Sequence, residues 1–189
     1  MTKPAYDFSQ MDFSRVCVIG SAGSGKTTFC KALGNLLSRQ VTHLDKILWG
    51  ENWTELTREQ QVQILTSVVE TDQWIIDGLW ASTLEMRYKR ATVVIFLNYK
   101  PALCAWRAFT RAIKHKGKQR DDLATGCIEK IDFSFYNYIL KFRKHSLPKI
   151  KQLQQDFPTV PVVCLNTPNQ TQQFVEQLQV YINTINHQA

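Results

Sequence analysis

The chain has 189 residues, of which 44% are hydrophobic and 21% are charged, and its formal net charge at pH 7 is +7. This length suits a single globular domain with a sizeable core, and the composition excludes an intrinsically disordered chain. The longest apolar run, residues 91–97, is too short to cross a bilayer, and residues 1–10 lack the apolar core of a signal peptide. We therefore expect an intracellular, cytoplasmic protein without a membrane segment.

The first apolar stretch, residues 15–20, has the composition of a buried strand and runs into GSAGSGKTTF. Gly20, Gly25, Lys26 and Thr27 fit the pattern G-x-x-x-x-G-K-[ST], in which backbone N–H groups converge on phosphate oxygens. The helix expected from Lys26 directs its free N–H groups and the positive end of its dipole at the same anion. In such a loop Lys26 contacts the β- and γ-phosphates of ATP and Thr27 is a ligand of Mg²⁺. The predicted nucleotide site consists of Gly20, Ser21, Ala22, Gly23, Ser24, Gly25, Lys26, Thr27 and Thr28.

Strand and helix patterns alternate through the first half of the chain. The helix after the glycine-rich loop has Phe29, Leu33 and Leu36 or Leu37 on one face, and the next strand is expected at residues 41–45. A helix is predicted over residues 57–71, because Thr57 and Gln60 can form a capping box. Its apolar face is predicted from the spacing of Val62, Leu65 and Val69. A third strand follows at residues 74–78.

The second half continues the alternation. A strand is expected at 91–98, a basic amphipathic helix at 100–120, a long helix at 132–155, a strand at 160–166 and a helix at 170–186. Pro148 should bend or divide the long helix. The alternation predicts a parallel sheet with helices on both faces. Because no repeat or linker interrupts it, we expect an N-terminal extension at 1–14 and one domain at 15–189.

Three polar side chains follow predicted strands, at the edge of the sheet where open parallel sheets bind ligands: Asp45, Asp77 and Asn166. Asp77, followed by Gly78, matches the acidic position that holds Mg²⁺ through water in phosphate-loop proteins. The alternative role for Asp77 is that of a capping or turn residue. Asp45 could contact metal or substrate, or cap the next segment.

Basic residues concentrate in two clusters. The first consists of Arg107, Arg111, Lys114, Lys116, Lys118 and Arg120, and the second of Lys141, Arg143, Lys144, Lys149 and Lys151. Each could be a solvated face, or the two could converge on nucleotide phosphates or on nucleic acid. The five cysteines and four histidines show no metal-ligand spacing, so we assign no role to the histidines.

Four further residues have two alternative roles each. Arg87 could bind an anionic group of an acceptor substrate, or pair with Glu85 on the surface. Trp49, Trp53 and Trp80 could stack on a planar acceptor, although packing at the edge of the core is the commoner role of aromatic residues near strand ends.

Several further segments resemble the bacterial topology modulation protein family, a branch of the adenylate kinase and shikimate kinase group. With the glycine-rich loop, these are HLDKILWGENW, WIIDGLWASTLEMR, FLNYKPALCAWRAFTRAIKHKGKQRDD, GCIEK and FRKHSLPKI. The resemblance covers nearly the whole chain after about residue 14. It implies a three-layer α/β P-loop fold whose five-stranded parallel sheet has the strand order 2-3-1-4-5. The family name implies a role in DNA topology, whereas the group's architecture implies phosphoryl transfer.

The resemblance also implies roles for arginines around a lid at about residues 107–128. Arg107 and Arg111 resemble the arginines that enter the lid of nucleotide kinases, Arg120 lies where a lid arginine would close, and Arg143 resembles the arginine at the lid's exit. Thr167 lies where kinases of this group bring a loop against the adenine. Leu79 and Trp80 replace the Phe-Pro-Arg of adenylate kinases, which argues against an AMP site.

Together these observations predict an ATP- and Mg²⁺-dependent phosphotransferase that acts on a small-molecule acceptor. Lys26, Arg107, Arg111 and Arg120 would stabilise the transferring phosphoryl group, and Asp45 is the candidate acceptor contact or base. One alternative is an ATP-binding regulator associated with DNA, whose basic clusters bind the nucleic-acid backbone weakly and without sequence specificity. Another is an ATPase without an acceptor.

Overall fold

The computed structural model describes residues 6–51, 54–114 and 132–187. Within these ranges the strands form one parallel sheet of five strands in the order β2-β3-β1-β4-β5. The strands are β1 Arg15–Gly20, β2 Val41–His43, β3 Trp74–Asp77, β4 Val93–Leu97 and β5 Val162–Leu165. The structure thus confirms the predicted fold class and strand order.

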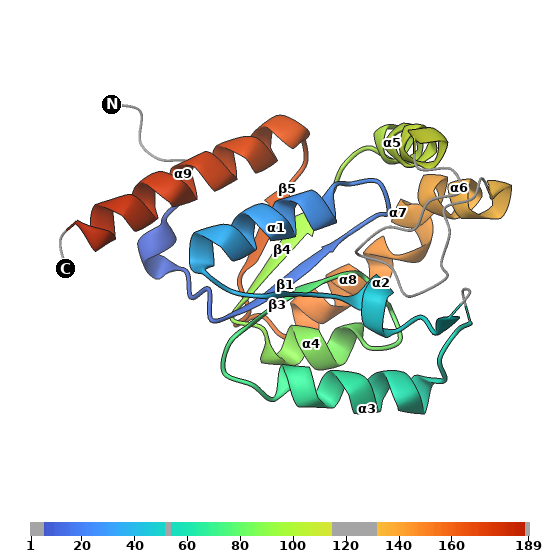
Figure 1. Cartoon of the computed structure of the whole chain (residues 1–189), viewed down its shortest axis with the longest axis horizontal. Coiled ribbons are helices and arrows are strands. Elements are labelled where there is room, and N and C mark those ends of the chain that lie inside the picture. Colours follow the sequence, from blue (N-terminus) through green and yellow to red (C-terminus); the bar gives the residue numbers. More distant parts are fainter. Residues whose placement is uncertain (1–5, 52–53, 115–131, 188–189) are drawn as a thin grey trace.

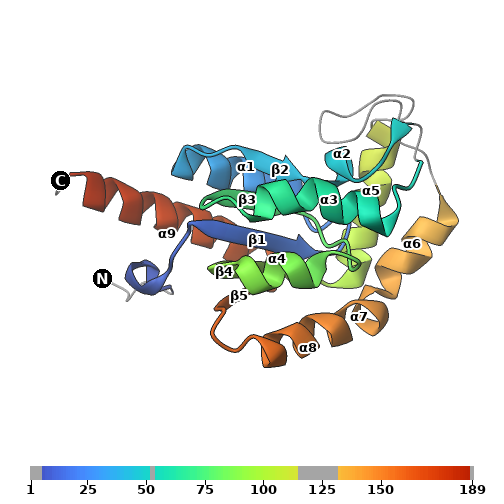
Figure 2. The same ribbon diagram turned by 90° about the horizontal axis from the view of Figure 1, so that it is seen from below.

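Helices cover both faces of the sheet (Figures 1 and 2). They are α1 Lys26–Leu37, α2 Leu44–Ile47, α3 Arg58–Val69, α4 Leu84–Arg90, α5 Pro101–Lys114, α6 Phe133–Leu140, α7 Phe142–His145, α8 Leu147–Asp156 and α9 Pro168–Asn186, with a short 3-10 helix, η1, at Phe8–Gln10. Helices α1 and α9 pack on one face, and α3, α4 and α8 on the other. Helices α5 and α6 lie together beyond the carboxyl ends of the strands (Figure 2).

The alternation of side chains along the strands builds two cores. In β1, Val16 and Val18 face α1 and α9, whereas Cys17 and Ile19 face α3, α4 and α8. All four side chains are fully buried. Because a strand buried on both faces needs apolar residues at every position, the continuous apolar run was a sound predictor of this strand.

One predicted long helix is three helices in the structure, α6, α7 and α8. The helix predicted over 132–155 is divided twice, at Lys141 and again at Ser146. Pro148 lies in the first turn of α8, where its missing N–H and fixed φ are tolerated, so the proline divides the helix as expected. The structure gives no comparable local reason for the break at Lys141.

The capping box predicted for α3 is confirmed, because Thr57 accepts from the Gln60 N–H and Gln60 accepts from the Thr57 N–H. The predicted apolar face is wrong at Val62, which is 37% exposed. The neighbouring Gln61 is buried instead with Leu65 and Val69. Its side chain donates to the Leu56 carbonyl at 3.0 Å and accepts from the Ser82 hydroxyl at 2.7 Å, which satisfies the buried amide.

Candidate functional site

The glycine-rich loop joins β1 to α1 at the centre of the sheet. Gly23 and Gly25 have φ angles of +77° and +89°, a region that favours glycine. Gly25 directly precedes α1, so the free N–H groups of the first helical turn face the space enclosed by the loop. The hydroxyls of Ser21 and Ser24 are buried and have no hydrogen-bond partner among the described residues.

Helix α5 packs directly on this loop. A Cβ atom on Gly23 would lie 2.1 Å from the Cys104 carbonyl oxygen, so only glycine allows this approach. A Cβ on Gly25 would meet nothing closer than Arg107 Nη1, at 3.9 Å. The loop therefore fixes the position of α5, and with it the position of the Arg107 guanidinium.

We expect Gly23→Ala to destabilise the protein more than Gly25→Ala. Both substitutions put alanine in the left-handed region, at a cost of about 1–2 kcal/mol each. Only Gly23→Ala also forces α5 away from the loop, which adds about 1–3 kcal/mol for overpacking. Urea unfolding of both variants measures the difference, and equal free energies of unfolding would contradict the contact with Cys104.

Asp77 lies beside the phosphate loop at the end of β3. Its Oδ2 accepts hydrogen bonds from the Thr27 hydroxyl at 3.1 Å and from His43 Nδ1 at 2.8 Å. Asp77 is 5% exposed, and its Oδ1 has no hydrogen-bond partner among the described residues. The two residues predicted to hold Mg²⁺ are thus brought together in space.

His43 was missed by the sequence reasoning, which assigned it no role. It pairs with Asp77 in the register of the parallel strands β2 and β3, so their side chains lie on the same side of the sheet. Spacing along the sequence cannot reveal this contact. The available signal was positional, since both residues lie near the ends of the strands predicted at 41–45 and 74–78, and they end β2 and β3 in the structure.

The donor set at Asp77 fits Mg²⁺ rather than a transition metal. Among the described residues no group of three or more His, Cys, Asp or Glu side chains could hold a metal ion by itself. Mg²⁺ is usually held by one or two protein oxygens together with water and substrate phosphates. The Thr27 hydroxyl, the buried Asp77 carboxylate and the adjacent phosphate loop meet that description.

Two basic side chains, Lys26 and Arg107, lie at the loop. Lys26 Nζ donates to the Ser21 carbonyl at 3.1 Å, and the Arg107 guanidinium lies 5.8 Å from the centre of the Tyr99 ring. Burial raises the pKa of the Cys104 thiol, and the positive charges of Lys26, Arg107 and Arg143 oppose that rise. Lys26 and Arg107 both lie at the start of α1, where the glycine-rich loop ends.

The structure places two other predicted arginines on α5 and α7. Arg111 is partly buried, one turn after Arg107 on α5, and Arg143 is exposed on α7. Lys149, in the second basic cluster, lies 3.4 Å from Glu85. Trp53, Lys116, Lys118 and Arg120 lie outside the described residues, as does most of the predicted lid segment.

The remaining predicted site residues lie on either side of the loop. Asp45 is in the first turn of α2, after β2, and its Oδ1 accepts from Trp80 Nε1 at 2.9 Å. Thr167 is exposed after β5 and caps α9 by accepting from the Gln170 N–H. The side chain of Asn166 accepts from Asn98 Nδ2 at 3.0 Å. Asp45 and Thr167 therefore follow the two edge strands, β2 and β5, on either side of the central β1.

Both sequence interpretations of Arg87 are wrong. The side chain is fully buried rather than exposed, and it neither faces an anion site nor pairs with Glu85. Its guanidinium donates to the carbonyl oxygens of Gly78, Leu79 and Trp80 at 2.9, 2.5 and 3.2 Å. Burial lowers its pKa, and the nearby Cys17 and Asp77 oppose that effect.

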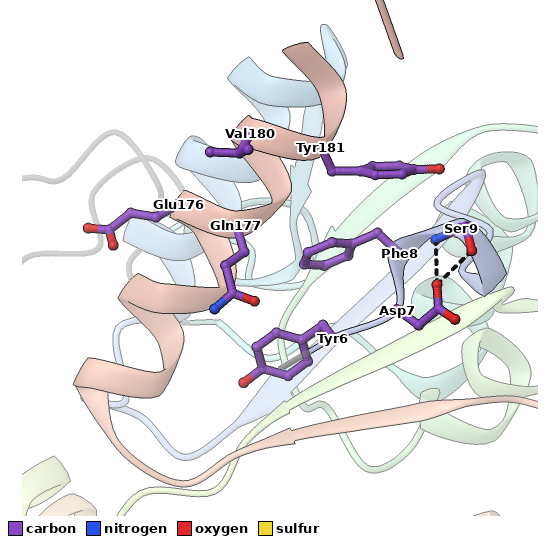
Figure 3. A pocket seen from close by; sticks show the side chains of 8 residues that line it. All are labelled: Tyr6, Asp7, Phe8, Ser9, Glu176, Gln177, Val180 and Tyr181. Carbon is purple, nitrogen blue, oxygen red and sulfur yellow. Dashed lines mark hydrogen bonds between the residues drawn. The ribbon is translucent and has the colours of Figure 1, made fainter. Parts of the chain in front are cut away.

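A groove of about 390 Å³ lies elsewhere, between η1 and α9 (Figure 3). Phe8 and Tyr181 contribute to its wall, and the Phe8 ring packs edge-on against Phe174 at 5.3 Å. Its lining is mainly apolar, and it is remote from the phosphate loop.

Among the described residues, every helix is too short or too polar to cross a lipid bilayer.

Two proteins of known structure are similar to this chain. A shikimate kinase from Acinetobacter baumannii, in complex with shikimate, matches 94% of this chain and 96% of its own, with a TM-score of 0.53 and 15% identity. A deoxyadenosine kinase from M. mycoides with bound dCTP matches 87% of this chain and 98% of its own, with a TM-score of 0.46 and 13% identity. No family model and no curated protein matches the chain. The resemblance to the topology modulation proteins therefore stays a prediction.

Proposed function

We propose that this protein is an ATP-dependent phosphotransferase that transfers the γ-phosphoryl group to a hydroxyl of a small acceptor. The observation that carries the proposal is the meeting of Thr27 and Asp77, at 3.1 Å, beside a glycine-rich loop that opens onto a helix N-terminus. Anion-binding N–H groups and hard oxygen ligands for Mg²⁺ then serve the same phosphates. The fold shared with a shikimate kinase supports this assignment.

Different residues of the loop bind the phosphates of ATP and stabilise their negative charge. The N–H groups at the start of α1 hold the phosphate chain, and Lys26, released from the Ser21 carbonyl, donates to its β- and γ-oxygens. Thr27 and Asp77 would hold Mg²⁺, which neutralises charge on the same phosphates when it is bound. Arg107 adds a second positive charge from α5.

The acceptor would approach from the side of the sheet that carries Asp45. Its hydroxyl oxygen forms a bond to the γ-phosphorus while the bond between that phosphorus and the β–γ bridging oxygen breaks, and the electron pair leaves with ADP. Asp45 takes the hydroxyl proton. Thr167 and Arg143 are proposed to border the nucleotide on the opposite side.

The test is acceptor-dependent formation of ADP. Purified protein is incubated with ATP and Mg²⁺ and with nucleosides, nucleotides or small alcohols, and the phosphorylated product is identified by mass spectrometry. We expect at least one acceptor to raise ADP formation with stoichiometric product. ADP formed at the same rate without any acceptor would favour an ATPase, and bound ATP that is never turned over would favour a regulator.

The metal assignment predicts a change in Mg²⁺ requirement. Asp77→Asn keeps the shape of the side chain and removes its charge, so we expect the Mg²⁺ concentration for half-maximal turnover to rise about 10- to 100-fold. Asp45→Asn is the matched control, because it should lower turnover without changing that concentration. Titration of both variants with Mg²⁺ at saturating ATP measures the effect. An unchanged requirement in Asp77→Asn would contradict the metal site.

A further inference from the structure

A buried arginine fixes the loop that follows β3. The Arg87 guanidinium is fully enclosed and donates to three consecutive carbonyl oxygens, those of residues 78–80. Buried cations are usually paired with a carboxylate, but among the described residues Arg87 has none within salt-bridge distance. Apart from a contact of Nη1 with Cys17 Sγ at 3.7 Å, the hydrogen bonds of this guanidinium thus go to the backbone of one short loop.

The last residue of that loop is held in an unfavourable conformation. Trp80 has a φ of +31°, a value that is rare for a bulky side chain. Its carbonyl accepts from Arg87 and, at 3.1 Å, from the Thr83 N–H, which hold the backbone in place. Strain of this kind persists where the surrounding structure imposes it, and it is typical of functional sites.

The held conformation directs the Trp80 indole at Asp45. Trp80 Nε1 donates to Asp45 Oδ1 at 2.9 Å, while Asp45 Oδ2 accepts no hydrogen bond from the described residues. The Trp49 ring packs edge-on against Trp80, with ring centroids 5.3 Å apart. Both indoles are partly exposed and Asp45 is exposed. Trp80 also packs against the core, which confirms the core-edge role for this tryptophan.

These three residues, Asp45, Trp49 and Trp80, form an aromatic and acidic cluster in the segments that follow β2 and β3, at the carboxyl ends of these strands. Asp45 is two residues from His43, whose ring contacts Asp77. An indole surface suits the apolar face of a ring, and a carboxylate oxygen suits a hydroxyl hydrogen. A second anion at this position would be repelled by Asp45, and Arg87 is enclosed and engaged with carbonyls rather than facing it.

Building on the proposed function, we propose that this cluster is the acceptor site and that it selects uncharged, ring-bearing alcohols over anionic acceptors. The tryptophans contact the ring, and Asp45 Oδ2 binds the reacting hydroxyl and takes its proton as the bond to phosphorus forms. Trp80 Nε1 holds the carboxylate in this orientation. Arg87 is a positioning residue that acts through the Trp80 backbone.

The test uses two acceptor panels with ATP and Mg²⁺. Adenosine, thymidine and myo-inositol are the uncharged probes, and AMP and shikimate are the anionic ones. We expect at least one uncharged probe to be phosphorylated with a kcat/KM at least tenfold above both anions. It should also shift the NMR signal of the Trp80 indole N–H, which is assigned by its loss in Trp80→Phe.

Variants separate the contributions. Trp80→Ala should raise the KM of the preferred acceptor at least tenfold, whereas Trp80→Phe, which keeps a ring but loses Nε1–H, should mainly lower kcat. Trp80→Gly should melt above Trp80→Ala, because glycine accepts the positive φ. Trp106→Ala is the matched control: Trp106 is a 63% exposed tryptophan on α5, outside the cluster, and its loss should change neither constant.

The outcomes distinguish the two proposals. Calorimetry with a non-hydrolysable ATP analogue tests the phosphate site alone, and absence of binding would overturn the proposed function and this inference together. If the analogue binds but no uncharged probe shifts the Trp80 signal, or if an anionic probe is preferred, only the acceptor site is wrong. Equal effects of Trp80→Ala and Trp106→Ala on KM would also overturn it.

Discussion

Replacing Lys26 by alanine is expected to lower ATP turnover at least about 10³-fold while the protein remains folded. The side chain lies at the start of α1, and within the described part of the chain it makes one hydrogen bond, to the Ser21 carbonyl at 3.1 Å, so little packing is lost. Its proposed work is to place a positive charge on the β- and γ-phosphates, and losing one such preorganised donor usually costs about 10²–10³ in rate. The loss of phosphate binding adds to that figure.

Lys31 offers a matched control, since it is an exposed lysine on the same helix. Lys31→Ala should retain the parental turnover. Both variants should unfold within about 1 kcal/mol of the parent, because Lys31 is exposed and the loss of the partly buried Lys26 side chain breaks one hydrogen bond, to the Ser21 carbonyl. Turnover measured by ADP formation and stability measured in urea decide the matter. Parental turnover in Lys26→Ala would mean that the loop is only a turn between β1 and α1.

The phosphate loop was predictable because its chemistry is local. Positive φ angles at Gly23 and Gly25 and the helix beginning at Lys26 follow from the residues of one short segment. The capping box at Thr57 is local in the same way. Patterns of this kind need no knowledge of the rest of the chain.

Burial that depends on distant partners could not be read in the same way. In α3, apolar spacing favours Val62 as a core residue, yet Gln61 is buried because Ser82, from the segment before α4, satisfies its side chain. Hydrophobic periodicity assumes that a polar residue faces water. One tertiary hydrogen bond is enough to reverse that assumption.

Arg87 and His43 illustrate the same limit within the site. Arg87 is buried because three carbonyls of a loop before α4 converge on it, and a charge pattern gives no sign of that convergence. His43 meets Asp77 only because β2 and β3 pair in one register. The sequence indicated the edge of the sheet where a site should lie, but not these contacts across strands.

Arg107 is expected to act on the transition state more than on bound ATP. The guanidinium is held over the Tyr99 ring, at 5.8 Å, and lies near Gly25 at the start of α1. Among the described residues it forms no salt bridge, so its charge is not neutralised by a carboxylate. A cation fixed in this way needs little reorganisation when negative charge shifts during transfer.

We therefore expect Arg107→Ala to lower turnover at least about 100-fold and to change ATP affinity less than about tenfold. Arg111→Ala should likewise lower turnover more than ATP affinity. Arginines at transferring phosphoryl groups are worth about 10³–10⁵ in rate, whereas ground-state phosphates already have the N–H groups of α1 and Lys26 as partners. The turnover of Arg107→Lys should fall between those of the parent and Arg107→Ala, because lysine keeps the charge without the planar guanidinium.

Arg58→Ala, which removes an exposed arginine from α3, is the control for net charge. Calorimetric ATP affinity is measured beside turnover for each variant. Equal losses of turnover and ATP affinity in Arg107→Ala would mean that Arg107 only binds ATP. Parental turnover in this variant would mean that Arg107 takes no part in catalysis.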